Sequence, residues 1–352
     1  MSAEKMKAAV LNEPGDLEIR DVDVPEPGPG EVLVRVRACG VCGSDLEIRD
    51  HGWEGAEFPF IMGHEWTGEV ADLGPETYHF EVGDRVASEP HDGCGMCRNC
   101  KVGKYTACLN YGDFSKGHQH HGFTVDGGYA HYCVIPESNL HELPDNMSYQ
   151  EGTLLTTAAC SLYAVERADV SAGDFVAVLG PGAIGLLAAQ IANYRGASEV
   201  LVSGTREPRL EAARELGADY TVNIHEEDPV ERVTELTDGV GPDVVIEAAG
   251  VHQAQQQAVE MVRRGGNVGL VGNPGEGVAE LDTQWIVSGD LDVVGVKAEG
   301  MNSTQRVTRL MSKREFETEP LLTHEYDLAD LPEAMSTFEN REEGAIKVVV
   351  NI

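Results

Sequence analysis

The chain has 352 residues, of which 41% are hydrophobic, and its 60 acidic residues exceed its 26 basic residues to give a formal net charge of −34. This length is greater than that of one ordinary domain and suits two. The acidic excess argues against nucleic acid and against anionic membrane surfaces as partners, because both are bound through clustered Lys and Arg.

The acidic residues have two interpretations. Disorder is one, but charged residues make up only 24% of the chain and the apolar segments are strongly periodic. A folded protein with an acidic surface is the better interpretation. Lysine is scarcer than arginine, which is typical of adaptation to high salt, where counterions screen the self-repulsion. We therefore expect a halophilic protein.

The N-terminal segment and the longest uncharged run both bear on localisation. The first residues, MSAEKMKAAVLNEPG, lack the apolar core of a signal peptide. The uncharged run 175–194 is long enough to suggest a membrane span, but Gly180, Pro181, Gly182 and Gly185 interrupt it. A strand, a turn and a helix explain the run better, and we expect a cytoplasmic protein without a membrane segment.

The first chemical motif follows an alternating apolar strand, EVLVRVRA, and lies in the turn-like segment ACGVCGSD. A catalytic zinc needs three protein ligands and one open position, and Cys42 with His64 and Glu65 of IMGHEWTGEV could supply them. Ser44 could accept a proton from a bound alcohol. A lone His-Glu pair is more often a satisfied polar pair, so this prediction depends on Cys42.

Four cysteines follow with the spacing C-x2-C-x2-C-x7-C: Cys94, Cys97, Cys100 and Cys108. Thiolates this close on a Gly-containing loop can enclose Zn²⁺ in a tetrahedral shell. Because four thiolates leave no open position, this zinc would be structural. The spacing alone leaves an iron–sulfur cluster open, whereas a disulfide knot is not expected in a reducing compartment.

Residues 174–190, DFVAVLGPGAIGLLAAQ, predict an apolar strand, a G-x-G-x-x-G turn and a helix. Gly180, Gly182 and Gly185 permit a tight turn and a close approach of pyrophosphate to the helix N-terminus, where Ala183 and Ile184 lie. Strand and helix patterns then alternate from EVLVSG to NVGLVG. This alternation predicts a parallel, doubly wound sheet that binds a dinucleotide.

The second strand of this sheet bears on the choice of dinucleotide. In NAD-binding proteins an acidic residue at the end of that strand holds the adenosine ribose. Here the strand ends at Gly204, and Glu199 stands at its beginning. The missing carboxylate favours NADP over NAD, with a 2′-phosphate site formed by Ser203, Gly204, Thr205, Arg206 and Arg209. The alternative is that both arginines only face solvent on the next helix.

The motifs along the chain are, in order, Cys42-Gly-Ser44-Asp45, Gly63-His64-Glu65-x-x-Gly68, Gly83-Asp84-Arg85-Val86, the four cysteines and the glycine motif. Their order resembles that of the zinc-containing medium-chain dehydrogenase/reductase superfamily. This is the group of alcohol, sorbitol, threonine and glucose dehydrogenases, and the resemblance covers essentially the whole chain.

The resemblance implies an α/β protein with two domains. Residues 1–155 and 293–352 would form a GroES-like β-barrel catalytic domain with a structural-zinc lobe at about 90–110. Residues 156–292 would form an inserted Rossmann domain with the doubly wound parallel sheet. A homodimer or homotetramer is also implied.

The resemblance assigns roles to residues at matching positions. Cys42, His64 and Glu65 match the catalytic-zinc site, Ser44 matches the proton-relay hydroxyl, and the four cysteines match the structural-zinc lobe. Asp45 is expected to orient the ligands from outside the coordination shell.

Two positions depart from the family pattern. The family's further metal-site residue, a Cys or a Glu, falls on Thr156 or Thr157, and neither is a good zinc ligand. The outer relay position, often His, is Glu47, and His51 lies four residues further on as a possible substitute. A glutamate at this position also occurs in sugar dehydrogenases of the superfamily.

The expected reaction is therefore reversible hydride transfer from a hydroxyl of a sugar or polyol to NADP or NAD, with Zn²⁺ at a catalytic and a structural site. A threonine-type or secondary-alcohol dehydrogenase is the nearest alternative. An NADP-binding sensor without turnover is an alternative from another class of protein. The three histidines from His118 to His121 are interpreted as decorating a loop near the cleft. Trp53, Phe58 and Trp66 either line the substrate pocket or pack in the core.

Overall fold

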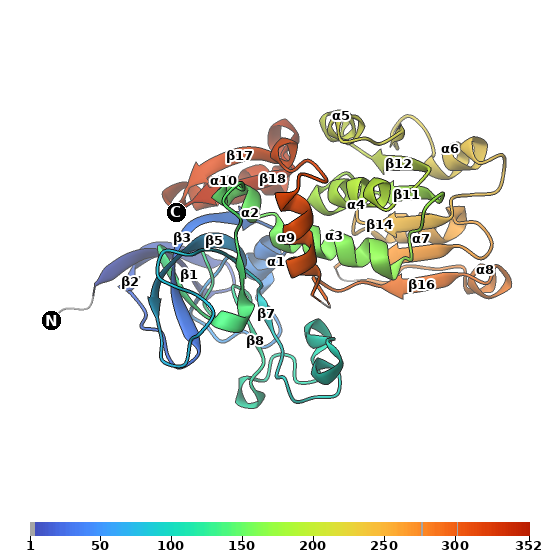
Figure 1. Cartoon of the computed structure of the whole chain (residues 1–352). Helices are drawn as coiled ribbons and strands as arrows, with labels where there is room; N and C mark the ends of the chain where they lie inside the picture. Colours follow the sequence, from blue (N-terminus) through green and yellow to red (C-terminus); the bar gives the residue numbers. More distant parts are fainter. Residues whose placement is uncertain (1–3, 276, 301) are drawn as a thin grey trace. The chain divides into compact units, whose positions relative to one another are not determined.

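A computed structural model describes residues 4–275, 277–300 and 302–352 (Figure 1). The chain divides into two compact units: Met1–Thr156 with Gly300–Ser312 and Leu322–Ile352, and Thr157–Glu299 with Lys313–Leu321. The second boundary therefore lies later than residue 293, where the sequence placed it. The reason is that Asp292–Gly295 forms β16, the edge strand of the sheet in the second unit.

The first unit is built mainly of β-strands. Its strands are β1 (Lys5–Glu13), β2 (Asp16–Asp23), β3 (Glu31–Val41), β4 (Phe60–Ile61), β5 (Glu65–Leu73), β6 (Arg85–Ser88), β7 (His91–Asp92), β8 (Gln119–His120), β9 (Tyr132–Pro136), β10 (Leu140–Glu142), β17 (Leu322–Asp327) and β18 (Lys347–Asn351). Its helices are α1 (Gly43–His51), α2 (Tyr149–Gly152), α9 (Ser303–Ser312) and α10 (Leu331–Asn340), and α3 (Leu155–Arg167) crosses the boundary.

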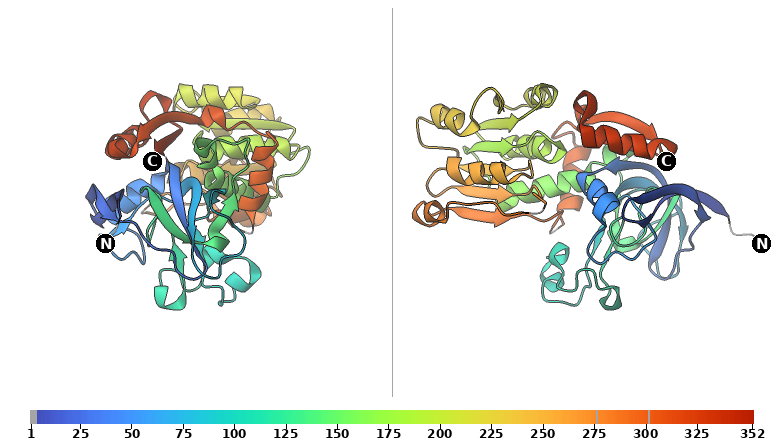
Figure 2. Two further views of the ribbon diagram at one scale, coloured as in Figure 1. Left: turned by 60° about the vertical axis from the view of Figure 1, so that its left-hand side comes forward. Right: turned by 180° about the vertical axis from the view of Figure 1, so that it is seen from behind.

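The strand order of this unit brings distant segments together. One sheet has the order β2-β1-β4, and a larger one has the order β10-β6-β5-β3-β18-β17, with β9 also paired to β3. The C-terminal strand β18 runs antiparallel to β3, and Figure 2 shows the red C-terminal segment returning to the blue N-terminal strands. Residues from both ends of the chain therefore meet at β3.

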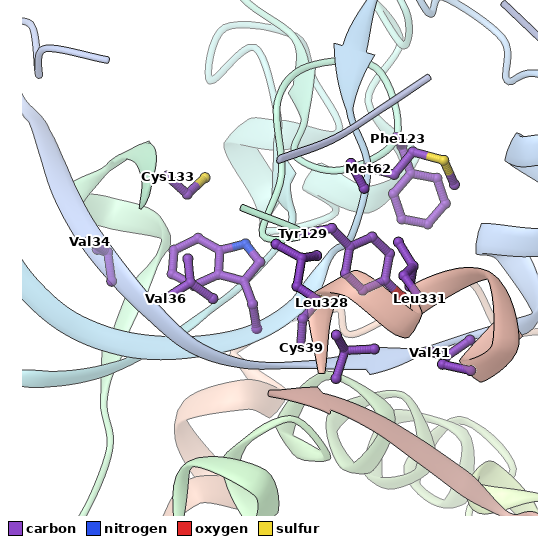
Figure 3. Packing of buried hydrophobic residues seen from close by; sticks show 14 of the residues in the cluster. Val34, Val36, Cys39, Val41, Met62, Phe123, Tyr129, Cys133, Leu328 and Leu331 are labelled. Carbon is purple, nitrogen blue, oxygen red and sulfur yellow. The ribbon is translucent and has the colours of Figure 1, made fainter. Parts of the chain in front are cut away.

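The core of the first unit follows from the alternation in β3. Val32, Val34 and Val36 point to one face and are at most 1% exposed, because alternate residues of a strand face opposite sides of the sheet. Figure 3 shows Val34 and Val36 in the buried cluster of this unit, which also contains Tyr129 and Leu328.

The second unit holds the predicted parallel sheet. Its strands are β11 (Phe175–Leu179), β12 (Glu199–Gly204), β13 (Tyr220–Asn223), β14 (Val244–Glu247), β15 (Asn267–Leu270) and β16, and its helices after α3 are α4 (Ala183–Tyr194), α5 (Glu207–Glu215), α6 (Pro229–Leu236), α7 (His252–Met261) and α8 (Thr283–Ser288). The strand order is β13-β12-β11-β14-β15-β16, and all neighbours run parallel.

This order reverses direction between β11 and β14, which is where open parallel sheets of this kind bind their ligands. Every residue of β11 is buried, as expected for a central strand covered on both faces. The uncharged run 175–194 is thus strand β11, a turn and helix α4. Among the described residues, no helix has the length and apolar character needed to span a bilayer.

Candidate metal and dinucleotide sites

Cys42, His64 and Glu65 come together in the first unit. Cys42 is the N-cap residue of α1, Glu65 is the first residue of β5, and His64 directly precedes it. The pairing of β3 with β5 sets Gly40 opposite Glu65 and so brings the two segments side by side. The candidate ligand atoms of the three residues all lie within 4.8 Å of one another. A thiolate, an imidazole and a carboxylate at this spacing fit a zinc ion.

Gly63 has the backbone conformation that turns the chain into this site. Its φ is 93°, in the left-handed region, and a Cβ on it would lie 2.7 Å from the ring of Tyr129. Both requirements exclude a side chain at this position. The glycine of the Gly63-His64-Glu65 motif is therefore explained by the local geometry.

Asp45 lies behind Cys42 and His64, as expected. It is fully buried, and its Oδ2 accepts a hydrogen bond of 2.9 Å from the backbone N–H of Cys42. Its Oδ1 lies 3.3 Å from Nδ1 of His64, which leaves the other ring nitrogen of His64 for a metal. Burial alone would lower the pKa of His64, but the carboxylate of Asp45 and the thiol of Cys42 together outweigh burial and raise it.

Lys347 is a residue of this site that sequence reasoning missed. Its Nζ lies 2.5 Å from Oε2 of Glu65, and both side chains are only 3% exposed. Burial would lower the pKa of Lys347, but Glu65 raises it above its usual range. The pairing of β18 with β3, with Val348 opposite Val41, carries this lysine to the site. No local motif marks residue 347, so only the strand pairing reveals it.

The predicted relay residues lie on one face of α1, since Ser44, Glu47 and His51 are three and four positions apart. The hydroxyl of Ser44 donates to Sγ of Cys42 at 3.2 Å. Ser44 and Glu47 are half-buried and His51 is exposed. Among the described residues no hydrogen bond links the three to one another. Their role in a relay stays a prediction.

Thr156 and Thr157 lie at the start of α3 and are buried. The hydroxyl of Thr156 lies 3.5 Å from the carbonyl oxygen of Ser88, a long hydrogen bond. In the part of the chain that the structure describes, the group around Cys42 has no fourth His, Cys, Asp or Glu ligand.

The histidine-rich loop is more deeply embedded than a decorated surface loop. His118, His120 and His121 are at most 4% exposed. The ring of His120 stacks on Phe123 with centroids 3.7 Å apart, and the Phe123 ring lies 4.4 Å from the ring of His64. The loop therefore packs beside the metal-site residues.

The two tryptophans differ in their surroundings. Trp53 is half-buried, and its Nε1 donates to the hydroxyl of Tyr111 at 2.8 Å. Trp66 is 1% exposed and belongs to the core.

Cys94, Cys97, Cys100 and Cys108 also have ligand atoms within 4.8 Å of one another. Backbone N–H donors lower the pKa of the Cys97 thiol to about 6, whereas desolvation and the neighbouring thiols raise the pKa of Cys100 to about 12. Four thiolates this close repel one another unless a cation lies between them. The residues fit a tetrahedral Zn²⁺ site.

The glycine motif leaves room for a pyrophosphate group at the N-terminus of α4. Gly180 has a φ of 106°, and a Cβ on it would lie 2.6 Å from the backbone nitrogen of Ala249. Gly182 is the N-cap of α4, and a Cβ on it would meet nothing within 4 Å. The first N–H groups of the helix, at Ala183, Ile184 and Gly185, have no acceptor within the helix and therefore suit an anion.

The end of β12 has a packing reason for its missing acid. A Cβ on Gly204, the last residue of β12, would lie 2.4 Å from the ring of Pro181. Thr205 and Arg206 are exposed and Arg209 is half-buried. Ser203 is only 4% exposed, so its hydroxyl is the least accessible of the proposed phosphate contacts.

Two parts of the chain match known protein families. Residues 28–145 match the alcohol dehydrogenase GroES-like domain, and residues 183–313 match the zinc-binding dehydrogenase family. The chain is 33% identical to sorbitol dehydrogenase of Bacillus subtilis (strain 168) over 350 residues, which are 99% of this chain and 97% of the relative. It is 37% identical to L-threonine 3-dehydrogenase of Pyrococcus furiosus over 330 residues, or 92% of each chain.

Solved structures are similar over almost the whole chain. A protein described as a zinc-binding dehydrogenase from Sinorhizobium meliloti 1021, bound to NADP, has a TM-score of 0.91 and 31% identity, over 99% of this chain and 100% of that one. The 2R,3R-butanediol dehydrogenase from Bacillus subtilis has a TM-score of 0.88 and 31% identity, over 99% of both chains.

This chain therefore belongs to the zinc-dependent medium-chain dehydrogenase/reductase superfamily. It is an oxidoreductase of the class that acts on CH–OH groups, with zinc and a nicotinamide dinucleotide as the cofactors of that class. The α/β fold with a GroES-like domain and a Rossmann sheet, expected from the sequence, is confirmed.

Proposed function

We propose that the chain oxidises a hydroxyl of a sugar or polyol and transfers the hydride to NADP⁺ or NAD⁺. The observation that carries this proposal is the cluster of Cys42, His64 and Glu65, with ligand atoms within 4.8 Å of one another and the hydroxyl of Ser44 next to Cys42. A protein that only binds a dinucleotide has no use for this set.

The residues of the first unit suit the proton transfer that alcohol oxidation requires. A zinc ion held by Cys42, His64 and Glu65 would supply Lewis acidity that lowers the pKa of a substrate hydroxyl. The hydroxyl of Ser44 would accept that proton and release its own towards Glu47 and His51, which lie on the same face of α1. In the second unit, the loop from Gly180 to Gly185 would hold the pyrophosphate of the dinucleotide.

Two substrate classes are supported to different degrees. Glu47 at the outer relay position and the similarity to a sorbitol dehydrogenase favour a sugar or polyol. The similarity to L-threonine 3-dehydrogenases, at 36% and 37% identity, makes a threonine-type amino alcohol the second candidate.

The test is reduction of NADP⁺ and NAD⁺ with a panel of polyols, aldoses, threonine, butanediol and simple alcohols, in molar KCl with added zinc. We expect turnover with one sugar or polyol and none in Cys42→Ser, which should still bind the dinucleotide. Turnover with threonine or a simple alcohol alone would contradict the sugar proposal. Dinucleotide binding without turnover in either protein would instead support the sensor.

The preference for NADP is part of the proposal. Gly204 leaves no carboxylate for a ribose, and the exposed Arg206 starts the next helix as its N-cap residue. We expect Arg206→Ala to raise KM for NADP⁺ by about tenfold with little change for NAD⁺, because an exposed charge-assisted contact contributes about 1–2 kcal/mol. Arg214→Ala is the matched control, because Arg214 on the same helix is paired with Glu207 and Glu211. Equal effects on both dinucleotides would contradict the preference.

The assembly and the location of the protein follow the family expectation. We propose a homodimer or homotetramer in the cytoplasm, and sedimentation analysis in molar KCl tests the oligomeric state. A monomer at micromolar concentration would contradict it.

A further inference from the structure

The hydroxyl of Tyr129 lies inside the core of the first unit. Tyr129 is 0% exposed, and its ring packs against an apolar cluster that includes Leu328 and Leu331 (Figure 3). A phenylalanine would fill the same space without a polar group that must be removed from water. The hydroxyl therefore needs an explanation in the atoms that it contacts.

Those atoms belong to the segment that carries Cys42. The hydroxyl oxygen lies 3.0 Å from Oδ2 of Asp45 and 3.1 Å from the carbonyl oxygen of Gly40. A phenol has a single proton to donate, so the carboxylate and the carbonyl share it. Asp45 in turn accepts from the backbone N–H of Cys42 and faces Nδ1 of His64. Tyr129 is thus the outer member of a chain of contacts that leads to two candidate zinc ligands.

The backbone of Tyr129 is also tied to the other ligand segment. Its N–H donates to the carbonyl of Met62 at 2.9 Å, and its carbonyl accepts from the N–H of Ala9 at 2.8 Å. The absence of a side chain on Gly63 lets the ring lie directly against the turn that leads to His64. The hydroxyl is therefore held in a fixed position relative to both ligand segments.

We propose that Tyr129 is a positioning residue of the metal site, whose hydroxyl fixes the carboxylate of Asp45 and thereby the geometry of Cys42 and His64. The inference rests on the proposed function, because it requires that these residues bind zinc. Loss of a hydrogen-bonding partner outside the coordination shell typically lowers metal affinity by about 10- to 100-fold. Tyr129 acts through Asp45, so we expect the lower end of that range, about tenfold.

The test compares Tyr129→Phe with the unsubstituted chain. The zinc dissociation constant of the Cys42 site is measured by competition with a chromophoric chelator, and the absorption spectrum of the Co²⁺-substituted protein reports the ligand geometry. Cys42→Ser identifies the signal of this site against that of the cysteine lobe. Tyr326→Phe is the matched control, because it removes a hydroxyl that contacts Thr337 at 2.8 Å and no candidate ligand.

We expect about tenfold weaker zinc binding and a changed Co²⁺ spectrum for Tyr129→Phe, and neither change for Tyr326→Phe. In an Asp45→Asn background the effect of Tyr129→Phe should disappear, because the two residues act in series. Unchanged affinity in Tyr129→Phe, or an equal loss in both backgrounds, would overturn the inference. If Cys42→Ser itself removes no metal signal, the proposed function fails as well, so the two failures are distinguishable.

Discussion

Glu65 and Lys347 form a salt bridge that is almost completely removed from water, with both side chains 3% exposed. Surface pairs such as Lys5 with Asp23, which are 58% and 62% exposed, contribute little because water screens the two charges. For a buried pair the desolvation cost is large, and removal of one partner leaves the other charge uncompensated.

We predict that Lys347→Met lowers the free energy of unfolding by about 3–5 kcal/mol in the presence of chelator, because the Glu65 carboxylate loses its counter-charge. Urea unfolding followed by circular dichroism measures the change. Lys5→Met is the control and should change the free energy by about 0.5 kcal/mol or less.

Added zinc should restore part of the lost stability, because a cation that binds Glu65 replaces the ammonium group. A loss for Lys347→Met no larger than that for Lys5→Met would show that the buried pair is not needed.

At the scale of elements, Glu89 joins the cysteine lobe to the sheet. It follows β6, and its carboxylate accepts a hydrogen bond from the hydroxyl of Tyr105 in the lobe. Nε2 of His141, in β10, lies 2.8 Å from the other carboxylate oxygen. Burial alone would raise the pKa of Glu89, but His141 and Tyr105 outweigh burial and hold it below its usual value of 4.5.

This lowered pKa predicts the sign of a pH effect on stability. A carboxyl group with a depressed folded-state pKa stabilises the protein above its unfolded-state pKa, and the contribution is lost as the pH falls through the folded-state pKa. We expect the difference in unfolding free energy between the unsubstituted chain and Glu89→Gln to shrink as the pH falls below 4.5. Urea unfolding at several pH values measures it, and a difference that does not vary with pH would contradict the prediction.

The cysteine lobe has few buried apolar contacts. Its regular structure consists of short turns at Cys100–Val102 and Tyr105–Ala107, and Met96, Val102 and Leu109 are 73%, 63% and 55% exposed. Few buried apolar contacts mean a low free energy of local opening.

We predict that a strong chelator increases hydrogen exchange and protease cleavage in residues 94–108 while the strands of the large sheet stay protected, because the bound metal supplies the folding energy of such a lobe. Re-addition of zinc should restore protection. Unchanged exchange in the lobe after verified loss of metal would show that the thiols do not depend on it.

At the scale of the whole molecule, the net charge of −34 makes self-repulsion a property of the entire surface. The charges are screened over about 10 Å at 0.1 M salt and about 3 Å at 1 M salt. We predict that the thermal unfolding midpoint rises by about 5 °C or more between 0.1 M and 2 M KCl, because screening removes the repulsion that favours the unfolded chain. Sucrose at matched osmolality is the non-ionic control, and equal shifts in KCl and sucrose would contradict the electrostatic explanation.

The fold class and the metal and dinucleotide motifs could be predicted from the sequence because they depend on local patterns. Alternation in β3, the glycines around α4 and the four closely spaced cysteines each lie within a short segment. The pairing of Cys42 with His64 and Glu65 spans about twenty residues, and the sequence could propose it only because the three residue types suit one metal. Their proximity is established by the pairing of β3 with β5.

Only the tertiary structure revealed Lys347, the hydroxyl of Tyr129, and β16 as part of the second unit. Each depends on long-range strand pairing or on complete burial, and neither leaves a periodic signal near the residue. The missing acid at Gly204 shows the same division. The sequence alone shows that no acid is present. The physical reason lies in the tertiary structure: the turn after β11 brings the ring of Pro181 within 2.4 Å of the place where a Cβ on Gly204 would lie.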